Sequence, residues 1–156
     1  FLLVSRSKTT VRSATAQDMP SVFELIKELA RYEKAADQVK NSVEQLTEDG
    51  FGKNPAFECL VAENENNIVG FALYFNKYST WRGKCIYLED LCVSESFRQK
   101  GIGTLLFDEV LKIAKERKMK RLEWQVLEWN TPAIEFYKKY KANLDPEWIN
   151  GKLFLD

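Results

Sequence analysis

The stretch SFRQKGIGT, residues 96–104, combines basic side chains with two closely spaced glycines. Gly101 and Gly103 bracket one isoleucine, and an apolar helical pattern begins immediately after them. Backbone N–H groups at a helix start have no partners and carry roughly half a positive charge, which suits a phosphate. Arg98 and Lys100 would add positive charge. The alternative is a tight turn that uses glycine for a positive φ angle, and the stretch alone does not separate the two.

Two well-known phosphate-binding motifs do not fit this loop. A Walker loop places its lysine after the last glycine, whereas Lys100 precedes Gly101. A dinucleotide-binding fingerprint needs a third glycine where this chain has Leu106. What remains is a basic turn with the pattern G-x-G at the N-terminus of a helix.

Composition restricts both the setting and the chemistry. The 156 residues fit one domain, and Lys plus Arg and Asp plus Glu both total 23, so we expect neither a nucleic acid partner nor a membrane. The cysteines Cys59, Cys85 and Cys92 form no C-x-x-C motif, which favours a reduced, cytoplasmic setting. Histidine is absent, so another side chain or water must move any proton, and we expect no metal.

Hydrophobic periodicity predicts the elements that would position these residues. We expect strands at 9–15, 57–63, 67–75, 83–94, 121–127 and 151–156. We expect helices at 18–34, 42–50, 104–118 and 130–140. Leu105 should lie on the apolar face of the third helix, and Thr131 should be the N-cap of the fourth. This order predicts a mixed α/β sheet in one domain.

Apolar residues change parity within the strand at 83–94. Ile86 and Leu88 share one parity, whereas Leu91 and Val93 share the other. Burial on both faces of the strand would explain the change, and so would a β-bulge near Asp90.

The pattern R-x-x-G-x-G between a strand and an amphipathic helix resembles the pyrophosphate loop of the GNAT acetyltransferase superfamily. Three parts of that family occur in the same order here, as YLEDLCV, RQKGIGT and WNTPAIEFY. LIKELARYEK, EDGFGKNP and VLEWNTPAIEFYKK resemble the spermidine/spermine acetyltransferase family more narrowly. DQVK and YSTW-basic-G resemble its thialysine acetyltransferase branch.

This resemblance implies an α/β (α+β), GNAT-like domain at 9–156, with a mixed, mostly antiparallel central sheet flanked by helices. Residues 1–8 would be a disordered or non-native N-terminus. The family implies acetyl-coenzyme A (acetyl-CoA) as cosubstrate, direct transfer to an amine, and a homodimer. The residues that it assigns to the coenzyme are Leu91, Cys92, Val93, Arg98, Gln99, Lys100, Gly101, Ile102, Gly103, Thr104, Asn130, Thr131, Pro132 and Ala133.

Acetyl transfer to an amine needs two proton movements. Freeing the lone pair of an alkylamine at neutral pH costs about 4–5 kcal/mol. The resemblance assigns this proton to Glu89, acting through water as base or positioner; otherwise Glu89 would be a solvated strand end or a salt-bridge partner. The coenzyme leaves as a thiolate, and the resemblance assigns its protonation to Tyr137, whose alternative role is a core aromatic beside Ile134 and Tyr140.

A cationic substrate requires carboxylates near the reacting thioester. The substrate contacts implied by the resemblance are Tyr32, Glu33, Trp81, Glu89, Asp90, Glu123, Trp124 and Gln125. Polyamine enzymes carry D-P-W-x-G where this chain has Ser79-Thr80-Trp81-Arg82-Gly83, and the exchange of an acid for Arg82 favours a shorter amine. Lys141 replaces a glycine of the family, and Glu147 with Trp148 matches its E-G-W motif only loosely.

The leading hypothesis is therefore acetyl transfer to thialysine, a lysine-like amino acid or a diamine. One alternative is acetylation of a protein or peptide amine. Another is a non-catalytic module that binds acyl-CoA.

Overall fold

The computed structural model describes residues 8–156, so most of the expected N-terminal segment lies outside the described residues. Lys8 precedes the first strand and forms an ion pair with Glu65 at 3.1 Å. The chain divides into two compact units, Phe1–Gln125 and Val126–Asp156.

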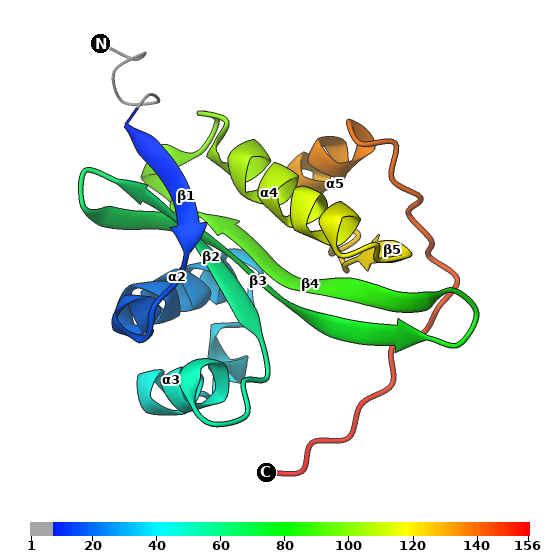
Figure 1. Ribbon diagram of the computed structural model, residues 1–156, viewed down its shortest axis with the longest axis horizontal. Helices are drawn as coiled ribbons and strands as arrows, with labels where there is room; N and C mark the ends of the chain where they lie inside the picture. The colour runs from blue at the N-terminus through cyan, green and yellow to red at the C-terminus, as the bar shows by residue number, and fades with distance from the viewer. Residues whose placement is uncertain (1–7) are drawn as a thin grey trace. The chain divides into compact units, whose positions relative to one another are not determined.

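The first unit is built on a five-stranded sheet with the order β1-β2-β3-β4-β5 (Figure 1). The antiparallel strands are β1 (Thr9–Ser13), β2 (Glu58–Asn64), β3 (Asn67–Ser79) and β4 (Gly83–Val93). β5 (Arg121–Glu123) pairs with β4 in parallel. The predicted mixed, mostly antiparallel sheet is confirmed, although the strand predicted at 121–127 is shorter than expected.

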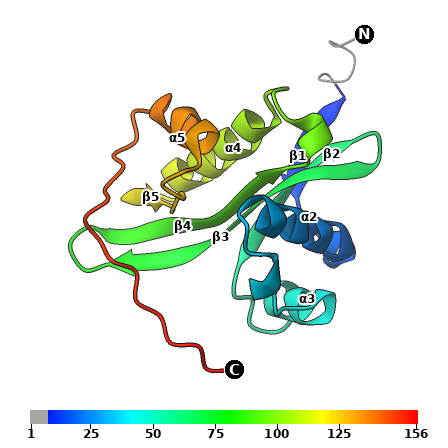
Figure 2. The ribbon, with the colours of Figure 1, turned by 180° about the vertical axis from the view of Figure 1, so that it is seen from behind.

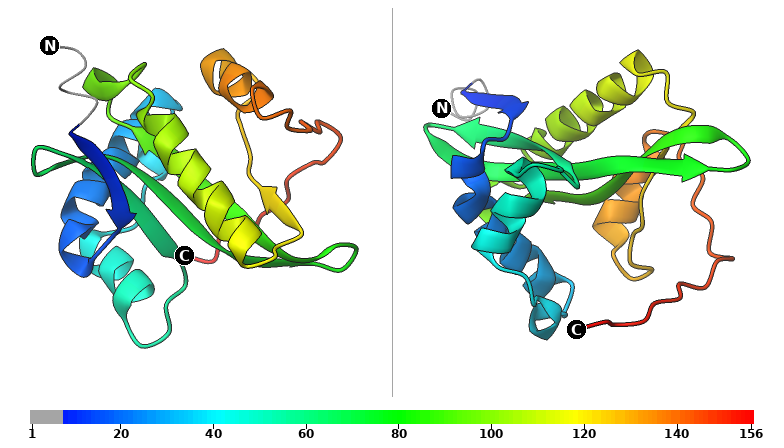
Figure 3. Two further views of the ribbon diagram at one scale, coloured as in Figure 1. Left: turned by 45° about the horizontal axis from the view of Figure 1, so that its top comes forward. Right: turned by 60° about the horizontal axis from the view of Figure 1, so that its bottom comes forward.

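Helices cover both faces of this sheet (Figures 2 and 3). α2 (Met19–Tyr32) and α3 (Val43–Phe51) lie on one face, and α4 (Ile102–Glu116) lies on the other. Asp18 is the N-cap of α2 and Pro20 lies in its first turn, as the sequence predicts.

The end predicted for α3 is wrong. Ser42 starts this helix by accepting a hydrogen bond from the N–H of Gln45 at 3.1 Å. The helix then runs through Gly50 and is capped at Gly52. Gly50 is required inside the helix because the Phe57 ring occupies the space that a Cβ would need.

An Arg–carboxylate pair links β1 to the start of α2. The guanidinium of Arg12 donates to both carboxylate oxygens of Asp18, at 2.8 and 3.0 Å. Asp18 Oδ2 also accepts from the backbone N–H of Thr15 at 2.7 Å. These bonds compensate for the burial of the Asp18 carboxylate.

Two apolar cores flank the sheet. The core under α2 includes Met19, Val22, Leu25, Leu46, Cys59, Val61, Phe71, Leu73 and Cys92. The buried residues of α4 are Ile102, Leu106, Phe107, Val110 and Ala114. Leu105 was expected on this buried face, but its side chain is 39% exposed, so that prediction is wrong. Phe107 contributes instead and packs edge-on against Trp124, with ring centroids 5.4 Å apart.

The three cysteines are free and buried. Burial, together with nearby carboxylates, raises the pKa of Cys59 and of Cys92 to about 12. Within residues 8–156, none of the helices has the length and hydropathy that crossing a membrane requires.

The second unit contains α5 (Thr131–Lys138), followed by a segment at 142–156 without assigned helix or strand. The N-cap of α5 is Asn130 and not the predicted Thr131, because the Asn130 side chain accepts from the N–H of Ala133 at 3.4 Å. The strand predicted at 151–156 is also wrong. The three consecutive apolar residues 153–155 suit a strand, but no paired neighbour is found in the described part of the chain.

Candidate active site

A β-bulge in β4 determines how the candidate residues face. Leu73 of β3 pairs with Asp90, whereas the next residue, Tyr74, pairs with Leu88. Glu89 is therefore the extra residue of the bulge and has no partner on β3. The bulge that the sequence allowed near Asp90 is confirmed.

The bulge also explains the change of parity along β4. The thiol of Cys92 donates to the carbonyl of Leu25 in α2 at 3.7 Å, so Cys92 faces α2. Asp90, two residues earlier, shares this face. The apolar residues on either side of the bulge consequently share the opposite face, which α4 covers. They are Ile86, Leu88, Leu91 and Val93.

Three predicted carboxylates interact at the C-terminal end of α2. Glu33 is the C-cap of α2. Burial raises the pKa of Asp90 to about 7, and the negative charges of Glu89 and Glu33 add to this effect. Burial also raises the pKa of Glu33, whereas Glu89 is exposed. Asp90 can therefore exchange a proton close to neutral pH.

The guanidinium of Arg98 is directed toward α2. Its Cζ lies 4.9 Å from the ring centroid of Tyr32, the last residue of the helix. Its Nε donates to the carbonyl of Val93 at 3.0 Å, and its Nη2 is 3.9 Å from Glu28 Oε2. Glu28 was not among the predicted residues, although its i, i+4 spacing from Tyr32 places both on one face of a helix.

The loop between β4 and α4 presents backbone donors. Gln99 and Gly101 have positive φ angles of 63° and 80°, and α4 begins directly after Gly101. The first bond that closes a helical turn runs from the N–H of Leu105 to the carbonyl of Gly101 at 3.1 Å. The N–H groups of residues 102–104 therefore have no acceptor within the helix and can bind an anion.

Basic side chains contribute less to this loop than the sequence suggests. The ammonium of Lys100 lies 5.1 Å from the ring centroid of Phe97, and Arg98 is engaged with α2. The N–H groups of residues 102–104 are therefore the clearer candidates for holding an anion.

The edge of β4 that faces β5 is paired over a short length. The pairs run from Cys85 with Arg121 to Tyr87 with Glu123 (Figure 1). In the part of the chain that the structure describes, no strand continues this ladder beside the later residues of β4, which include the predicted coenzyme residues 91–93. Backbone groups on an open edge can bind an extended ligand that carries amides.

Glu123, predicted to contact the substrate, has intramolecular partners. Burial opposes its ionisation, but hydrogen bonds from Lys77 at 3.0 Å and Arg121 at 2.9 Å outweigh burial and lower its pKa. Trp124 packs against Phe107 on the α4 side, and Gln125 is exposed at the end of the first unit.

Trp81 is not close to the carboxylates at the end of α2. It is 87% exposed and lies in the turn between β3 and β4, which projects away from α2 in Figure 1. The charges of Glu33 and Glu89 thus act on Asp90, whereas Trp81 lies in a turn that projects away from α2.

The remaining predicted residues lie in the second unit. Tyr137 belongs to α5, and its ring packs against that of Phe136 with centroids 5.2 Å apart. Asn130, Thr131, Pro132 and Ala133 form the capped start of this helix. Lys141, which replaces the family's glycine, has a φ angle of 58° and keeps the left-handed conformation that glycine favours. The indole N–H of Trp148 donates to Asp145 at 2.9 Å.

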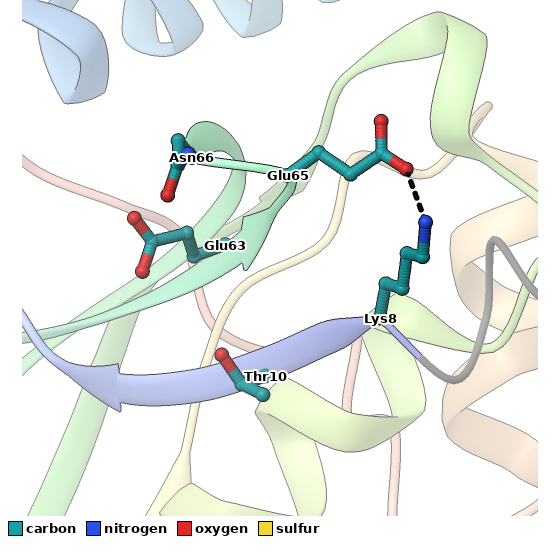
Figure 4. A pocket seen from close by; sticks show the side chains of 5 residues that line it. All are labelled: Lys8, Thr10, Glu63, Glu65 and Asn66. Carbon is teal, nitrogen blue, oxygen red and sulfur yellow. Dashed lines mark hydrogen bonds and ion pairs between the residues drawn. The ribbon is translucent and has the colours of Figure 1, made fainter.

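A shallow pocket lies at the β1 edge of the sheet, between β1 and the β2–β3 turn (Figure 4). Its lining residues are Lys8, Thr10, Glu63, Glu65 and Asn66. None of them belongs to the predicted site. Among residues 8–156, no group of three or more Cys, Asp or Glu side chains is arranged to hold a metal ion.

An open strand edge that leads to a glycine loop at a helix N-terminus suits an extended ligand that carries amides and a phosphate. The model of the acetyltransferase (GNAT) family matches residues 19–141, and the chain belongs to this family. It is an N-acetyltransferase, and the family uses acetyl-CoA.

Curated relatives and solved structures agree with this assignment. The chain is 42% identical over 140 residues to thialysine N-epsilon-acetyltransferase from Sus scrofa, covering 85% of this chain and 82% of that protein. It is 37% identical over 134 residues to spermidine/spermine N(1)-acetyltransferase-like protein 1 from Homo sapiens, covering 81% of this chain and 19% of that longer protein. An integron cassette protein from the mobile metagenome of V. cholerae has a TM-score of 0.76 and 25% identity over 94% of this chain and 93% of that chain.

Proposed function

We propose that this N-acetyltransferase moves the acetyl group of acetyl-CoA directly to the side-chain amine of thialysine or a lysine-like amino acid, with a diamine as second choice. The observation that carries the proposal is that Glu33, the C-cap of α2, and Glu89 of the β4 bulge both act on Asp90 through their negative charges. Three carboxylates attract a cationic amine. In a dimer whose β3–β4 turn reaches the acceptor site of the partner copy, Arg82 of that turn would oppose a second, distant ammonium and favour a short acceptor. The names of the relatives support the same substrate class.

In this proposal the coenzyme binds along the open edge of β4. The backbone of residues 91–93 faces the pantetheine arm, and the N–H groups of residues 99–104 hold the pyrophosphate. The positive φ angles of Gln99 and Gly101 and the open helix start support this fit. Asn130 to Ala133 would complete the coenzyme contacts, together with the charge of Lys100.

Proton transfer divides between two sites in the proposal. Exposed Glu89 orients water and the ammonium, and Asp90, whose pKa burial raises to about 7, takes the proton. Asp90 is better matched to this task than an ordinary carboxylate, because its pKa is closer to that of the amine. The Tyr137 hydroxyl donates a proton to the departing thiolate.

We further propose that the enzyme is a cytoplasmic homodimer that needs no metal and binds neither nucleic acid nor membrane. The C-terminal segment supports a dimer because it carries several exposed large apolar side chains, which a second copy could cover. They are Trp148, Ile149, Leu153, Phe154 and Leu155. In such a dimer, Trp81 of one copy would reach the acceptor site of the other copy.

Thiol release from acetyl-CoA tests the proposed substrate class. The acceptors to compare are thialysine, lysine, ornithine, putrescine, spermidine and a lysine-containing peptide. We expect the highest kcat/KM with thialysine. A much higher value with spermidine would contradict the choice of a short amine, and activity on the peptide alone would support a protein acetyltransferase. Silence with every acceptor, with acetyl-CoA binding intact, would indicate a non-catalytic module.

A further inference from the structure

We propose that Glu28 and Tyr32 of α2 position the coenzyme loop by holding Arg98, so that acetyl-CoA binding depends on residues of the acceptor-binding helix. The inference rests on the proposed function for the roles of the loop and of the end of α2. It assigns Arg98 to positioning, where the sequence suggested a phosphate contact.

The guanidinium of Arg98 contacts partners on β4 and α2. Its Nε donates to Val93, the last residue of β4, at 3.0 Å. Its Cζ lies over the ring of Tyr32 at 4.9 Å, within the range of a cation–π contact. Its Nη2 is 3.9 Å from Glu28 Oε2. The side chain thus connects the end of a strand to the last turn of a helix.

Glu28 holds the same segment at a second point. Its Oε2 accepts a hydrogen bond from the backbone N–H of Glu95 at 3.1 Å. Glu95 begins the short 3-10 helix Glu95–Phe97, which leads directly into Arg98. Helix α2 therefore contacts the start of the loop through Glu28 and its middle through both Glu28 and Tyr32.

The chemistry of arginine is essential to this arrangement. A planar guanidinium can donate in its plane to Val93 and pair with the charge of Glu28 at 3.9 Å while its face rests on the Tyr32 ring. Lysine would keep the positive charge but could not make the three contacts together. A phosphate contact through charge alone would tolerate lysine, so Arg98→Lys distinguishes the two roles.

A mechanical link of this kind works in both directions. A displaced loop lowers coenzyme affinity, and a loop fixed by coenzyme restrains Tyr32 and Glu33 at the acceptor site. Because coupling between two binding sites is reciprocal, the two ligands should strengthen each other's binding.

Calorimetric titration with acetyl-CoA tests the link without requiring activity. We expect Tyr32→Leu and Arg98→Lys each to weaken acetyl-CoA binding by about five- to ten-fold, the size of one cation–π contact with its hydrogen bond. Tyr32→Phe keeps the ring and should stay within about two-fold of wild type. Glu28→Gln should weaken binding, whereas the matched control Glu24→Gln, one turn earlier and paired with Lys27, should not.

The double variant Arg98→Lys/Tyr32→Leu decides whether the residues act together. If they do, it binds acetyl-CoA about as well as the weaker single variant. Additive losses, or normal binding in both Tyr32→Leu and Arg98→Lys, would overturn the inference. Circular dichroism and thermal unfolding of each variant distinguish lost positioning from lost folding.

A kinetic arm connects the inference to the proposed reaction. At saturating acetyl-CoA, Arg98→Lys should still raise the KM for thialysine by several-fold, because Tyr32 and Glu33 lose their support. An unchanged KM would contradict the idea that Arg98 supports the acceptor site. Wild-type inactivity toward every acceptor would refute the proposed function, and the calorimetric result on Arg98 and Tyr32 would still stand by itself.

Discussion

Asp90 lies directly across from Leu73 in the β3–β4 ladder, on the face of the sheet that α2 covers. The extra residue Glu89 produces this pairing. In an uninterrupted strand the residue facing α2 would be Leu91, and Asp90 would face α4. One inserted residue therefore places a carboxyl group in an apolar row, beside the end of α2.

The pH dependence of kcat/KM should report Asp90. Burial raises its pKa to about 7, with Glu89 and Glu33 adding to the shift, so the carboxyl is protonated below that pH and cannot accept a proton. We expect kcat/KM to fall as the pH drops through 7. Asp90→Asn should remove this limb and lower kcat by about 100-fold or more.

Glu89→Gln provides the matched comparison. Loss of the neighbouring negative charge should lower the pKa of Asp90 and move the acidic limb to lower pH. An acidic limb that persists unchanged in Asp90→Asn would show that another group takes the proton.

Tyr137→Phe should separate chemistry from binding. The change removes the hydroxyl that would protonate the thiolate but keeps the ring that packs on Phe136. We expect kcat to fall by about 100-fold while the Kd for acetyl-CoA, measured by calorimetry, stays within about two-fold. Tyr140→Phe, one turn further along the chain, is the control and should retain activity. Full turnover by Tyr137→Phe would rule out this tyrosine as the acid.

Asp18→Asn should destabilise the fold in a pH-dependent way. The hydrogen bond from Arg12 holds the pKa of Asp18 below its usual value despite burial, and the Thr15 N–H assists. A lowered folded-state pKa adds stability above the unfolded value near 4, and this stability is lost as the pH falls through the folded value. We expect a loss of about 2 kcal/mol in the free energy of unfolding at pH 7, shrinking toward pH 3, measured with urea.

Glu63→Gln is the control for that measurement. Glu63 accepts from Arg12 Nε at 3.1 Å but is more exposed than Asp18. Its loss should cost less than about 1 kcal/mol. Equal losses for the two variants would contradict a special role for the buried carboxylate.

Lys141→Gly should stabilise the chain. Lys141 holds a φ angle of 58°, which costs a residue with a side chain about 1 kcal/mol more than glycine. We expect a gain of about 0.5–1 kcal/mol in thermal unfolding. Lys139→Gly is the matched control, because Lys139 has a right-handed φ of −61° and glycine there should destabilise. A destabilised Lys141→Gly would mean that the lysine side chain outweighs its backbone strain.

The sequence predicted which helices and strands occur better than the exact residues at which they end. The parity change from Leu88 to Leu91 allowed a bulge or burial on both faces, and only the register of β3 with β4 decides for the bulge. Asn130 and Thr131 are both good N-caps, and nothing in the pair of side chains decides between them. The strand predicted at 151–156 was wrong because a strand needs a paired neighbour, which a short apolar run does not supply.

The sequence, with the family resemblance, nominates the residues of the site but does not reveal their contacts. Glu33 and Asp90 are far apart in sequence, and a family resemblance was needed to group them. Arg98 can reach either the start of α4 or the end of α2, and the sequence does not reveal the direction of so long a side chain. The sequence also does not reveal the hydrogen bonds that Glu123 accepts from Lys77 and Arg121, because they depend on how the strands are paired.

Because Cys59, Cys85 and Cys92 are buried, we expect the folded protein to react slowly with thiol-reactive reagents. A pKa of about 12 at Cys59 and Cys92 leaves fewer than about one thiol in ten thousand as thiolate near pH 7.5. Freed coenzyme has an ordinary thiol and reacts much faster. A colorimetric time course with a thiol reagent should therefore record the coenzyme thiol that is released, with little background from the cysteines of the folded enzyme.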